Sequence, residues 1–482
     1  MMIKLLLMLP VAISLILFLL RSKKLNQAML VIYSVLYLLS VFYIWLVPQE
    51  QSNDLFGLYF RVDALNVLFL LVLGVVFAGM ALYNLGFMKG LDVSRGSHTY
   101  YSIGVILFVL CMTGTLLSTH LGLSWVFIEA TTLASAYLVY FNKTKHSLEA
   151  AWKYVFICSI GISLAFVGII LLSIGTGHIN SLFFDGLYSQ ANKIVPIWLK
   201  LSFAFMLVGF GTKMGLAPVH AWLPDAHSEA PSPISALLSA ALLNSAFLII
   251  LKLYKLMELT HLDDYARTLL FTMGILSLFI TAVFIFGVKN YKRMLAYSSI
   301  ENMGIITIGI AIGGVGVFAA MLHLVGHSFI KSSFFLTSGN ILNRFQTKKI
   351  GEVSGILKID RVTGWLWIIC FVGIAGLPPS PLFISEFLMV KAMFIKQYFF
   401  LAAIFLLLLT VIIYGMGKLV LKMSFGDVSP HHTTLTQTGR TLSWHMYVPQ
   451  LILLAISVMI GLYMPDVVNK LIQGAATVIS TM

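Results

Sequence analysis

Charge is the property that this sequence has least of. Only 10% of its 482 residues are charged, whereas 59% are hydrophobic, and the mean hydropathy is +0.96. A soluble domain carries about 25% charged residues, so the composition excludes a soluble globular protein and indicates a polytopic membrane protein. The 31 Lys and Arg residues exceed the 18 Asp and Glu residues. In a membrane chain this excess predicts cationic cytoplasmic loops rather than nucleic-acid binding.

Cysteine is also scarce. Cys111, Cys158 and Cys370 stand singly inside apolar runs, and no CxxC pair occurs. This spacing argues against disulfides, iron–sulfur clusters and structural zinc, so we expect no cofactor and no metal. Long polar segments are missing too, and the longest loops leave no room for a soluble domain. One of these loops contains HHTT at 431–434, which we expect to be solvated.

What the chain does contain is apolar runs. A spanning helix needs roughly 20 apolar residues, and fourteen segments meet this requirement, which predicts an all-α polytopic membrane fold. We interpret the first as a retained span rather than a signal peptide, because its apolar core is too long and no cleavage site follows. The segments lie near 3–20, 28–47, 62–88, 99–118, 121–141, 150–174, 198–218, 232–256, 267–287, 294–313, 316–341, 363–395, 397–421 and 446–465.

The loop charges predict an orientation. Loops after odd-numbered spans hold 18 of the 31 Lys and Arg residues, the other side holds 10, and three fall within spans. Because positive loops stay inside, the side with 18 should be cytoplasmic. Both termini then face outward, and we expect a multi-pass protein of a prokaryotic cytoplasmic (inner) membrane.

Two spans contain helix-breaking stretches. GLAPVH at 215–220 interrupts span seven, and GLPPSP at 376–381 should divide span twelve into two half-helices. Paired broken helices five spans apart favour an inverted-repeat transporter whose site lies at the breaks.

Glu129 and Lys213 are ionisable residues placed deep in apolar sequence. Glu129 lies mid-span in LGLSWVFIEATTLASAYLVYF, and Lys213 lies just before the break at Pro218. A charge at the bilayer centre costs about 2.5–3.5 kcal/mol on insertion scales, so the two are functional candidates that we expect to meet as an ion pair. A change in this pairing would let the lysine release a proton.

Span eleven carries a row of titratable residues. His323, His327 and Lys331 recur every four residues and therefore share one helix face. A HxxxH pair also occurs in zinc sites, but no third ligand is evident. We interpret the row as a proton-hopping ladder.

Three further charged residues are candidates near the ends of the path. Glu386 follows the second break and could give a proton an exit, and Lys391 lies close by in the same helix. Lys153, near the start of span six, could either serve in transfer or simply extend to the interface.

Long ordered motifs carry a family resemblance. KMGLAPVHAWLPDAHSEAPSPISALL, KRMLAYSSIENMG and HLVGHSFIKSSFFLTSGNI resemble the proton-pumping antiporter-like subunits of complex I, Mrp antiporters and group 4 hydrogenases, with the hydrogenase-4 F-type subunit most similar. The resemblance implies two inverted five-helix repeats, spans 4–8 and 9–13. The expected parts of the chain are helices 1–3 at 1–98, the repeats at 99–256 and 267–421, and helix 14 with a tail at 446–482.

The resemblance also implies residue roles. Glu129 and Lys213 match the family's span-five glutamate and span-seven lysine, and His323, His327, Lys331 and Glu386 match its second-half relay. Relatives often carry a lysine or histidine in span eight, where this chain has Ser239 and Asn244. Water or Lys252 could bridge that gap. Asn290 stands where relatives often have Asp.

The stretch from 210 to 233 is expected to form a broken helix with its cytoplasmic mouth. His220 and His227 are candidate access groups there, although turn chemistry alone could explain them. Asp225 and Glu229 would line or shape the same mouth.

These features predict a proton-translocating subunit without redox chemistry of its own, driven by a peripheral electron-transfer arm through other membrane subunits. Three alternatives stay open: an Mrp-type sodium/proton antiporter subunit, a proton-conducting partner for inorganic carbon uptake, and a scaffold with vestigial charges.

Overall fold

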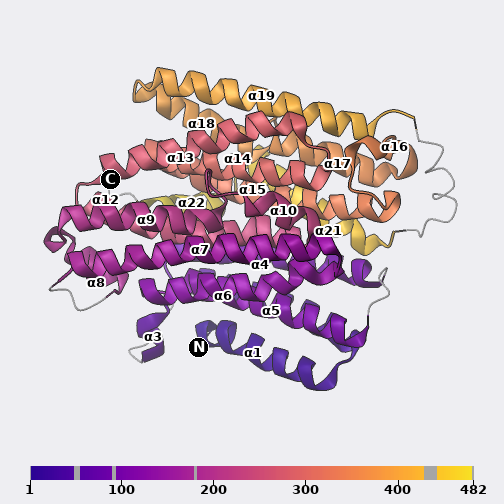
Figure 1. Ribbon diagram of the computed structural model, residues 1–482, viewed down its shortest axis with the longest axis horizontal. Helices are drawn as coiled ribbons and strands as arrows, with labels where there is room; N and C mark the ends of the chain where they lie inside the picture. Colours follow the sequence, from indigo (N-terminus) through magenta and orange to yellow (C-terminus); the bar gives the residue numbers. More distant parts are fainter. Residues whose placement is uncertain (1, 48–54, 90–93, 178–181, 428–441, 480–482) are drawn as a thin grey trace.

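A bundle of long helices makes up the molecule. The computed structural model describes residues 2–47, 55–89, 94–177, 182–427 and 442–479, which leaves the HHTT stretch outside the described residues. Thirteen helical segments within these ranges are long and apolar enough to cross a membrane. Figure 1 shows them lying side by side, with their axes roughly horizontal in that view.

The long helices and their partners agree with the predicted spans. They are α1 (Met2–Leu20), α2 (Lys23–Leu46), α4 (Ala64–Lys89), α5 (Arg95–Leu117), α6 (Leu121–Val139), α7 (Lys145–Gly175), α9 (Pro196–Met214), α11 (Ser232–Leu237) with α12 (Leu243–Leu259), α13 (Asp263–Phe284), α14 (Tyr291–Ile312), α15 (Val315–Phe345), α17 (Arg361–Ile374) with α18 (Pro381–Ile395), α19 (Phe399–Ser424) and α21 (Val448–Leu462).

Shorter elements complete the described chain. The short α-helices are α3 (Leu55–Tyr59), α8 (Phe184–Ser189), α10 (Trp222–Glu229), α16 (Ile356–Ile359) and α22 (Asp466–Ile479). A π-helical turn, η3 (Leu238–Leu242), joins α11 to α12. The 3-10 turns are η1 (Tyr140–Asn142), η2 (Ala191–Lys193), η4 (Ile285–Gly287), η5 (Ile350–Glu352) and η6 (Trp444–Met446).

Both predicted helix breaks are present. In the first, α9 ends at Met214, the following Gly215 takes the left-handed conformation (φ +80°), and α10 begins at Trp222. In the second, α17 ends at Ile374, Gly376 has φ +62°, and α18 begins at Pro381. Each break includes a cis proline peptide bond. Glycine is suited to both positions because side chains disfavour positive φ.

The breaks lie against a core of fully enclosed helices. In the segment formed by α11, η3 and α12, 100% of the residues in an apolar stretch of 18 are buried, and in α14 and α15 the share is 94% and 89%. In α1 and α19 only 33% of such a stretch is buried, and these two helices form opposite edges of the bundle in Figure 1. Polar groups on α12, α14 and α15 are therefore shielded from lipid by other helices.

The two ends of the bundle are distinguished here by their short helices. The α8 face carries α3 and α8 at the left of Figure 1, and the α16 face carries α16 at the right. Isolated bridges between Phe60 and Ser118 and between His120 and Phe183 tie the loops of the α8 face together.

Span fourteen is followed by a further helix, α22. Gly474 of α22 packs near Ala64, where α4 begins. In the preceding helix α21, a Cβ on Gly461 would lie 2.0 Å from the carbonyl oxygen of Pro379. The last long helix therefore touches the backbone of the second break.

Candidate functional site

Glu129 is held by hydroxyl groups on two helices. Ser159 of α7 donates to Oε1 at 2.8 Å, and Thr132 of α6 donates to Oε2 at 3.2 Å. The glutamate is only partly buried, on a side of α6 where Val126 and Leu133 are exposed. Hydroxyl donors stabilise a carboxylate but can also rotate away from it.

Lys213 is fully buried beside the first break. Its Nζ donates to the Tyr154 hydroxyl at 3.0 Å, and that hydroxyl lies 2.7 Å from Oγ of Ser135. Lys213 and Glu129 are close enough to interact electrostatically, but they form no ion pair. The expectation of direct pairing is therefore wrong in this structure, because α7 places Tyr154 as the nearest partner of the lysine.

Two polar contacts cross the centre of the bundle where the sequence lacks a charge. Ser239, in the π-helical turn, lies 2.8 Å from the hydroxyl of Ser299 on α14. Asn244 donates to Ser328 on α15 at 2.8 Å, while its own Oδ1 has no protein partner. π-Helical turns occur frequently at functional sites. Neutral groups thus connect the middle span to the helices of the second half.

The neighbours of His323 can form hydrogen bonds with its ring in either protonation state. The Asn302 amide nitrogen donates to Ser298 O at 2.6 Å, so Asn302 Oδ1 faces His323 Nε2 at 2.9 Å and accepts from it. The Ser385 hydroxyl lies 2.8 Å from His323 Nδ1 and 2.8 Å from Leu382 O. When Nδ1 is bare the hydroxyl can donate to it, and when Nδ1 is protonated the hydroxyl can turn to Leu382 O.

The other members of the span-eleven row are fully enclosed. His327 and Lys331 are 0% exposed, and neither ring nitrogen of His327 has a protein hydrogen-bond partner. Lys331 Nζ donates to the carbonyl oxygen of Leu295 at 2.7 Å and lies 5.9 Å from the centre of the Phe335 ring. A backbone carbonyl stabilises an ammonium group but cannot take its proton.

The second break brings Glu386 into close contact with the backbone. A Cβ on Gly376 would lie 2.3 Å from Glu386 Oε2, so the carboxyl group rests directly against the glycine. Lys391 is exposed on the outside of the same helix. The structure therefore separates these two candidates, although both belong to α18.

A charged cavity of about 240 Å³ lies beside α10. Asp225 lies at its centre, paired with Arg293 and, at 3.2 Å, with Lys153. Lys153 also pairs with Glu149 at 2.7 Å, and its side chain is 48% exposed. Lys153 thus belongs to the rim of this cavity and not to the buried row.

The α10 segment separates this cavity from the interior. Glu229, at the end of α10, lines the cavity and pairs with Lys348 at 2.9 Å. His227 is 0% exposed, has no protein partner for either ring nitrogen and stacks on Phe335 with ring centres 4.7 Å apart. His220 is partly buried in the break. Only His227 therefore lies on the interior side, close enough to Lys331 to interact electrostatically.

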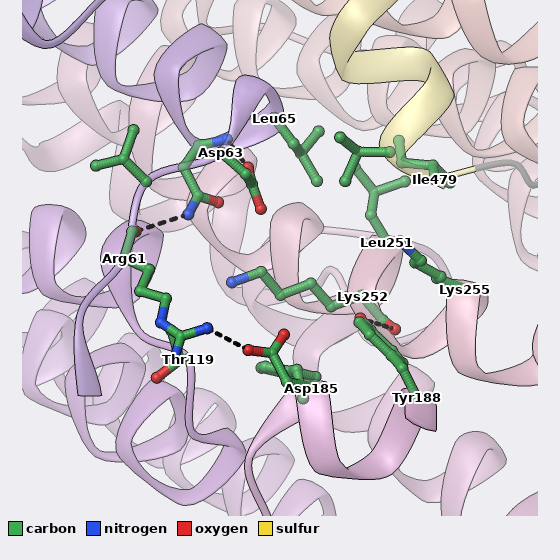
Figure 2. Close-up of a pocket in the computed structure, with 14 residues that line it drawn as sticks. Arg61, Asp63, Leu65, Thr119, Asp185, Tyr188, Leu251, Lys252, Lys255 and Ile479 are labelled. Atoms are coloured by element: carbon green, nitrogen blue, oxygen red, sulfur yellow. Dashed lines mark hydrogen bonds and ion pairs between the residues drawn. The ribbon is translucent and has the colours of Figure 1, made fainter. Parts of the chain in front are cut away.

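A second charged cavity, of about 330 Å³, lies on the α8 face. Figure 2 shows the Lys252 side chain extending toward the space between Arg61, Asp63 and Asp185. Lys252 Nζ donates to Ser118 O at 2.9 Å, and Arg61 pairs with Asp185 at 2.5 Å. Lys252 follows Asn244 by eight residues, about 12 Å along a helix. It does not fill the gap at Ser239 and Asn244, which corrects that expectation.

The described residues contain no group of three or more His, Cys, Asp or Glu side chains that could hold a metal ion.

Asn290, where relatives often have Asp, caps α14 by accepting from the backbone amides of Lys292 and Arg293. Its position is explained by helix capping.

Comparison with known proteins identifies the family. The model of the NADH:quinone oxidoreductase/Mrp antiporter transmembrane family matches residues 118–413. The chain belongs to this family. It is 36% identical over 385 residues to the "Hydrogenase-4 component F homolog" of Methylacidiphilum infernorum, covering 77% of this chain and 80% of the relative.

Solved structures of family members share the fold. A chain of the membrane-bound sulfane sulfur reductase, an archaeal respiratory membrane complex, matches with a TM-score of 0.87 and 26% identity, over 99% of this chain and 97% of the other. A chain of the Mrp complex from Dietzia sp. matches with a TM-score of 0.85 at 17% identity, over 99% and 97%, which shows the fold alone. The resemblance and the multi-span helical fold expected from the sequence are confirmed, and the chain is an antiporter-like membrane subunit.

Sequence reasoning missed one buried acid in this antiporter-family chain. Glu301 lies midway along α14, is 4% exposed and has no protein partner for Oε2. The signal was available, because the SSIEN string places a lone carboxyl inside a long apolar helix. Lys289, Lys292 and Arg293 precede this string, and such cations indicate a membrane surface rather than a buried acid.

Proposed function

We propose that this chain translocates protons as the antiporter-like membrane subunit of a multi-subunit redox complex related to group 4 hydrogenases. The observation that carries the proposal is a row of titratable, hydroxyl and amide groups through the interior, all of them buried except Glu386, which is partly buried. Its members are Ser135, Tyr154, Lys213, Ser239, Ser299, Asn244, Ser328, His323, Lys331, Ser385 and Glu386.

The proposed path begins at the α10 cavity, beside the first break. Lys213 Nζ donates to the Tyr154 hydroxyl, which can in turn donate to Ser135, so the three groups form a continuous hydrogen-bonded chain. Glu129 interacts with the lysine through space, and its hydroxyl partners can release it. A change at Glu129 would therefore change how readily Lys213 gives up its proton.

The second half of the path runs through His323. Its neighbours satisfy the imidazole in both protonation states, as a relay requires. Lys331 supplies the positive charge of this half, and Glu386 lies at the second break. Beside this path lie His327 and His227, and at its mouth by the α10 cavity lie His220 and Lys153. Lys252 and Lys391 lie nearer the surface.

For the orientation and the repeat architecture we propose what the sequence predicts. We place the α16 face in the cytoplasm of a prokaryotic inner membrane and both termini outside, because the loops on that face carry most of the cations. We also propose that spans 4–8 and 9–13 are inverted repeats, with one helix break in each.

Partner subunits would supply the energy. The relative from Methylacidiphilum is named as a hydrogenase component homolog, and the archaeal neighbour belongs to a respiratory complex. Exposed apolar side chains along α6 and α7, including Leu133, Trp152 and Phe156, offer a lateral surface for another membrane subunit next to Glu129. Electron transfer in a peripheral arm would act through such neighbours.

Proton uptake by liposomes containing the intact purified complex tests the proposal. With electron donor added, the wild-type complex should acidify the lumen, and Lys213→Ala should abolish acidification while electron transfer continues. Undiminished acidification in Lys213→Ala would favour a scaffold role. The subunits that co-purify decide the partner: a soluble zinc protein in place of a redox arm would favour inorganic carbon uptake.

A sodium/proton antiporter is the second candidate, because the Mrp complex has the same fold. Lys213 and Glu129 would serve there as well. Sodium efflux that drives lumen pH changes without electron donor would support this candidate, and acidification independent of sodium would exclude it.

A further inference from the structure

Glu301 is a buried carboxyl group to which the path described above gives no role. Ten residues of α14 precede it and eleven follow it, so it lies far from both helix ends. Its side chain is 4% exposed, and Oε2 has no hydrogen-bond partner in the described structure. A carboxyl in such a place is costly unless it is paired or protonated.

The surroundings of Glu301 belong to the second half of the path. From the same helix, Leu295 O binds Lys331, and Asn302 binds His323. Ser299, two residues before Glu301, contacts Ser239 of the central span. One stretch of α14 thus touches the middle of the bundle, the lysine and the histidine relay, and Glu301 is its only carboxyl group.

The charged groups near Glu301 come from two neighbouring helices. Helices α10, α13, α15 and α18 pack against α14. Lys331 of α15 and Glu386 of α18 both interact electrostatically with Glu301. The titratable side chains of α10 are Asp225, His227 and Glu229; His227 interacts with Lys331, whereas Asp225 pairs with Arg293 and Glu229 with Lys348. The titratable residues of α13 lie in its first turns, at 263–267.

We propose that Glu301 carries the proton between Lys331 and Glu386. The ammonium group of Lys331 gives a proton to the Glu301 carboxylate, which leaves a neutral amine and a neutral acid. The acid then passes the proton to the Glu386 carboxylate and becomes an anion that stabilises the reprotonated lysine. Leu295 O, the hydrogen-bond partner of Lys331, cannot take this proton from the lysine, because an amide carbonyl oxygen is a much weaker base than a carboxylate. This inference rests on the proposed function.

Infrared spectroscopy of the intact complex at stepped pH tests whether Glu301 binds and releases a proton. A band of a protonated carboxyl should be present in the wild type and missing in Glu301→Gln. In Lys331→Gln the same band should persist to higher pH, because the cation that favours the carboxylate is gone. A band pattern identical in wild type and Glu301→Gln at every pH would make Glu301 a fixed counter-ion and overturn the proposal.

Coupled pumping in liposomes gives the second measurement. Glu301→Gln should lower proton uptake at least about tenfold, since a positioned proton carrier contributes about 10²–10⁴ to a transfer rate. Glu301→Asp should restore part of it. Asp264→Asn, whose carboxyl is fully exposed, is the matched control and should pump normally. Wild-type pumping in Glu301→Gln contradicts the proposal.

The two measurements separate this inference from the function on which it rests. If the wild-type complex moved no protons, the proposed function would fail, and the infrared titration would still decide whether Glu301 exchanges a proton. If Glu301→Gln did not assemble, Glu301→Asp replaces it, and an unshifted carboxyl band in that variant counts against the proposal.

Discussion

The two halves of the bundle hold a glutamate and a lysine in different ways. In the first half, Glu129 and Lys213 each bind hydroxyl groups, and Tyr154 and Ser159 come from the same helix, α7. In the second half, Lys331 binds a backbone carbonyl, and Glu301 keeps one oxygen without a protein partner. Hydroxyl groups can donate and accept in turn, whereas a carbonyl only accepts.

This difference indicates where each half can change state. The first half can switch at the hydroxyl groups around Glu129 and Lys213. The second half must switch at its titratable groups, because the partner of Lys331 is fixed in the backbone of α14. His323, with a hydroxyl that can turn between two acceptors, adds a second adjustable point.

Removing the second-half cation should have the largest effect. Lys331→Gln should slow coupled proton uptake about a hundredfold, the scale of a lost positioned proton carrier. Lumen acidification per electron transferred is the measurement. If Lys331→Gln pumped as well as the wild type, the second half would not carry protons, and the comparison between the halves would lose its basis.

Removing the first-half hydroxyl should have an intermediate effect. Tyr154→Phe leaves Lys213 without its acceptor, and a hydrogen bond to a charged group is worth about 1.5–3 kcal/mol. Proton uptake should therefore fall about tenfold or more. Tyr100→Phe, at a side chain that is 46% exposed, is the matched control. Equal rates in both variants would show that Lys213 does not use Tyr154.

The adjustable hydroxyl beside His323 should matter less. Ser385→Ala removes one neutral hydrogen bond worth about 0.5–1.5 kcal/mol, so uptake should fall about two- to tenfold. Ser385→Thr keeps the hydroxyl and should recover most of the rate. If Ser385→Thr took up protons as slowly as Ser385→Ala, the loss would be due to altered packing and not to the missing hydroxyl.

The smallest effect is expected at the α8-face cavity. Lys252→Gln keeps a donor for Ser118 O and leaves the central contacts of Ser239 and Asn244 unchanged. Uptake should change by no more than about twofold, because distant sites act independently. A loss as large as that of Tyr154→Phe would place Lys252 back on the path.

Local sequence chemistry predicted the spans and both breaks. Glycine and proline impose backbone constraints wherever they occur, so GLAPVH and GLPPSP could be located without a structure. The partners of buried charges depend on tertiary packing instead. Nothing in the sequence around Lys213 indicates that Tyr154 lies between it and Ser135, and nothing around Glu301 indicates that Lys331 interacts with it.

The contact of Gly461 with Pro379 limits how α21 can vary between members of the family. Because the backbone of the bend occupies the space of a Cβ at Gly461, this position cannot acquire a larger residue unless the bend shifts at the same time. The final long helix, α21, is therefore coupled to the bend in span twelve through this contact. Chimeras that exchange α21 between family members should assemble only when the GLPPSP bend is exchanged with it.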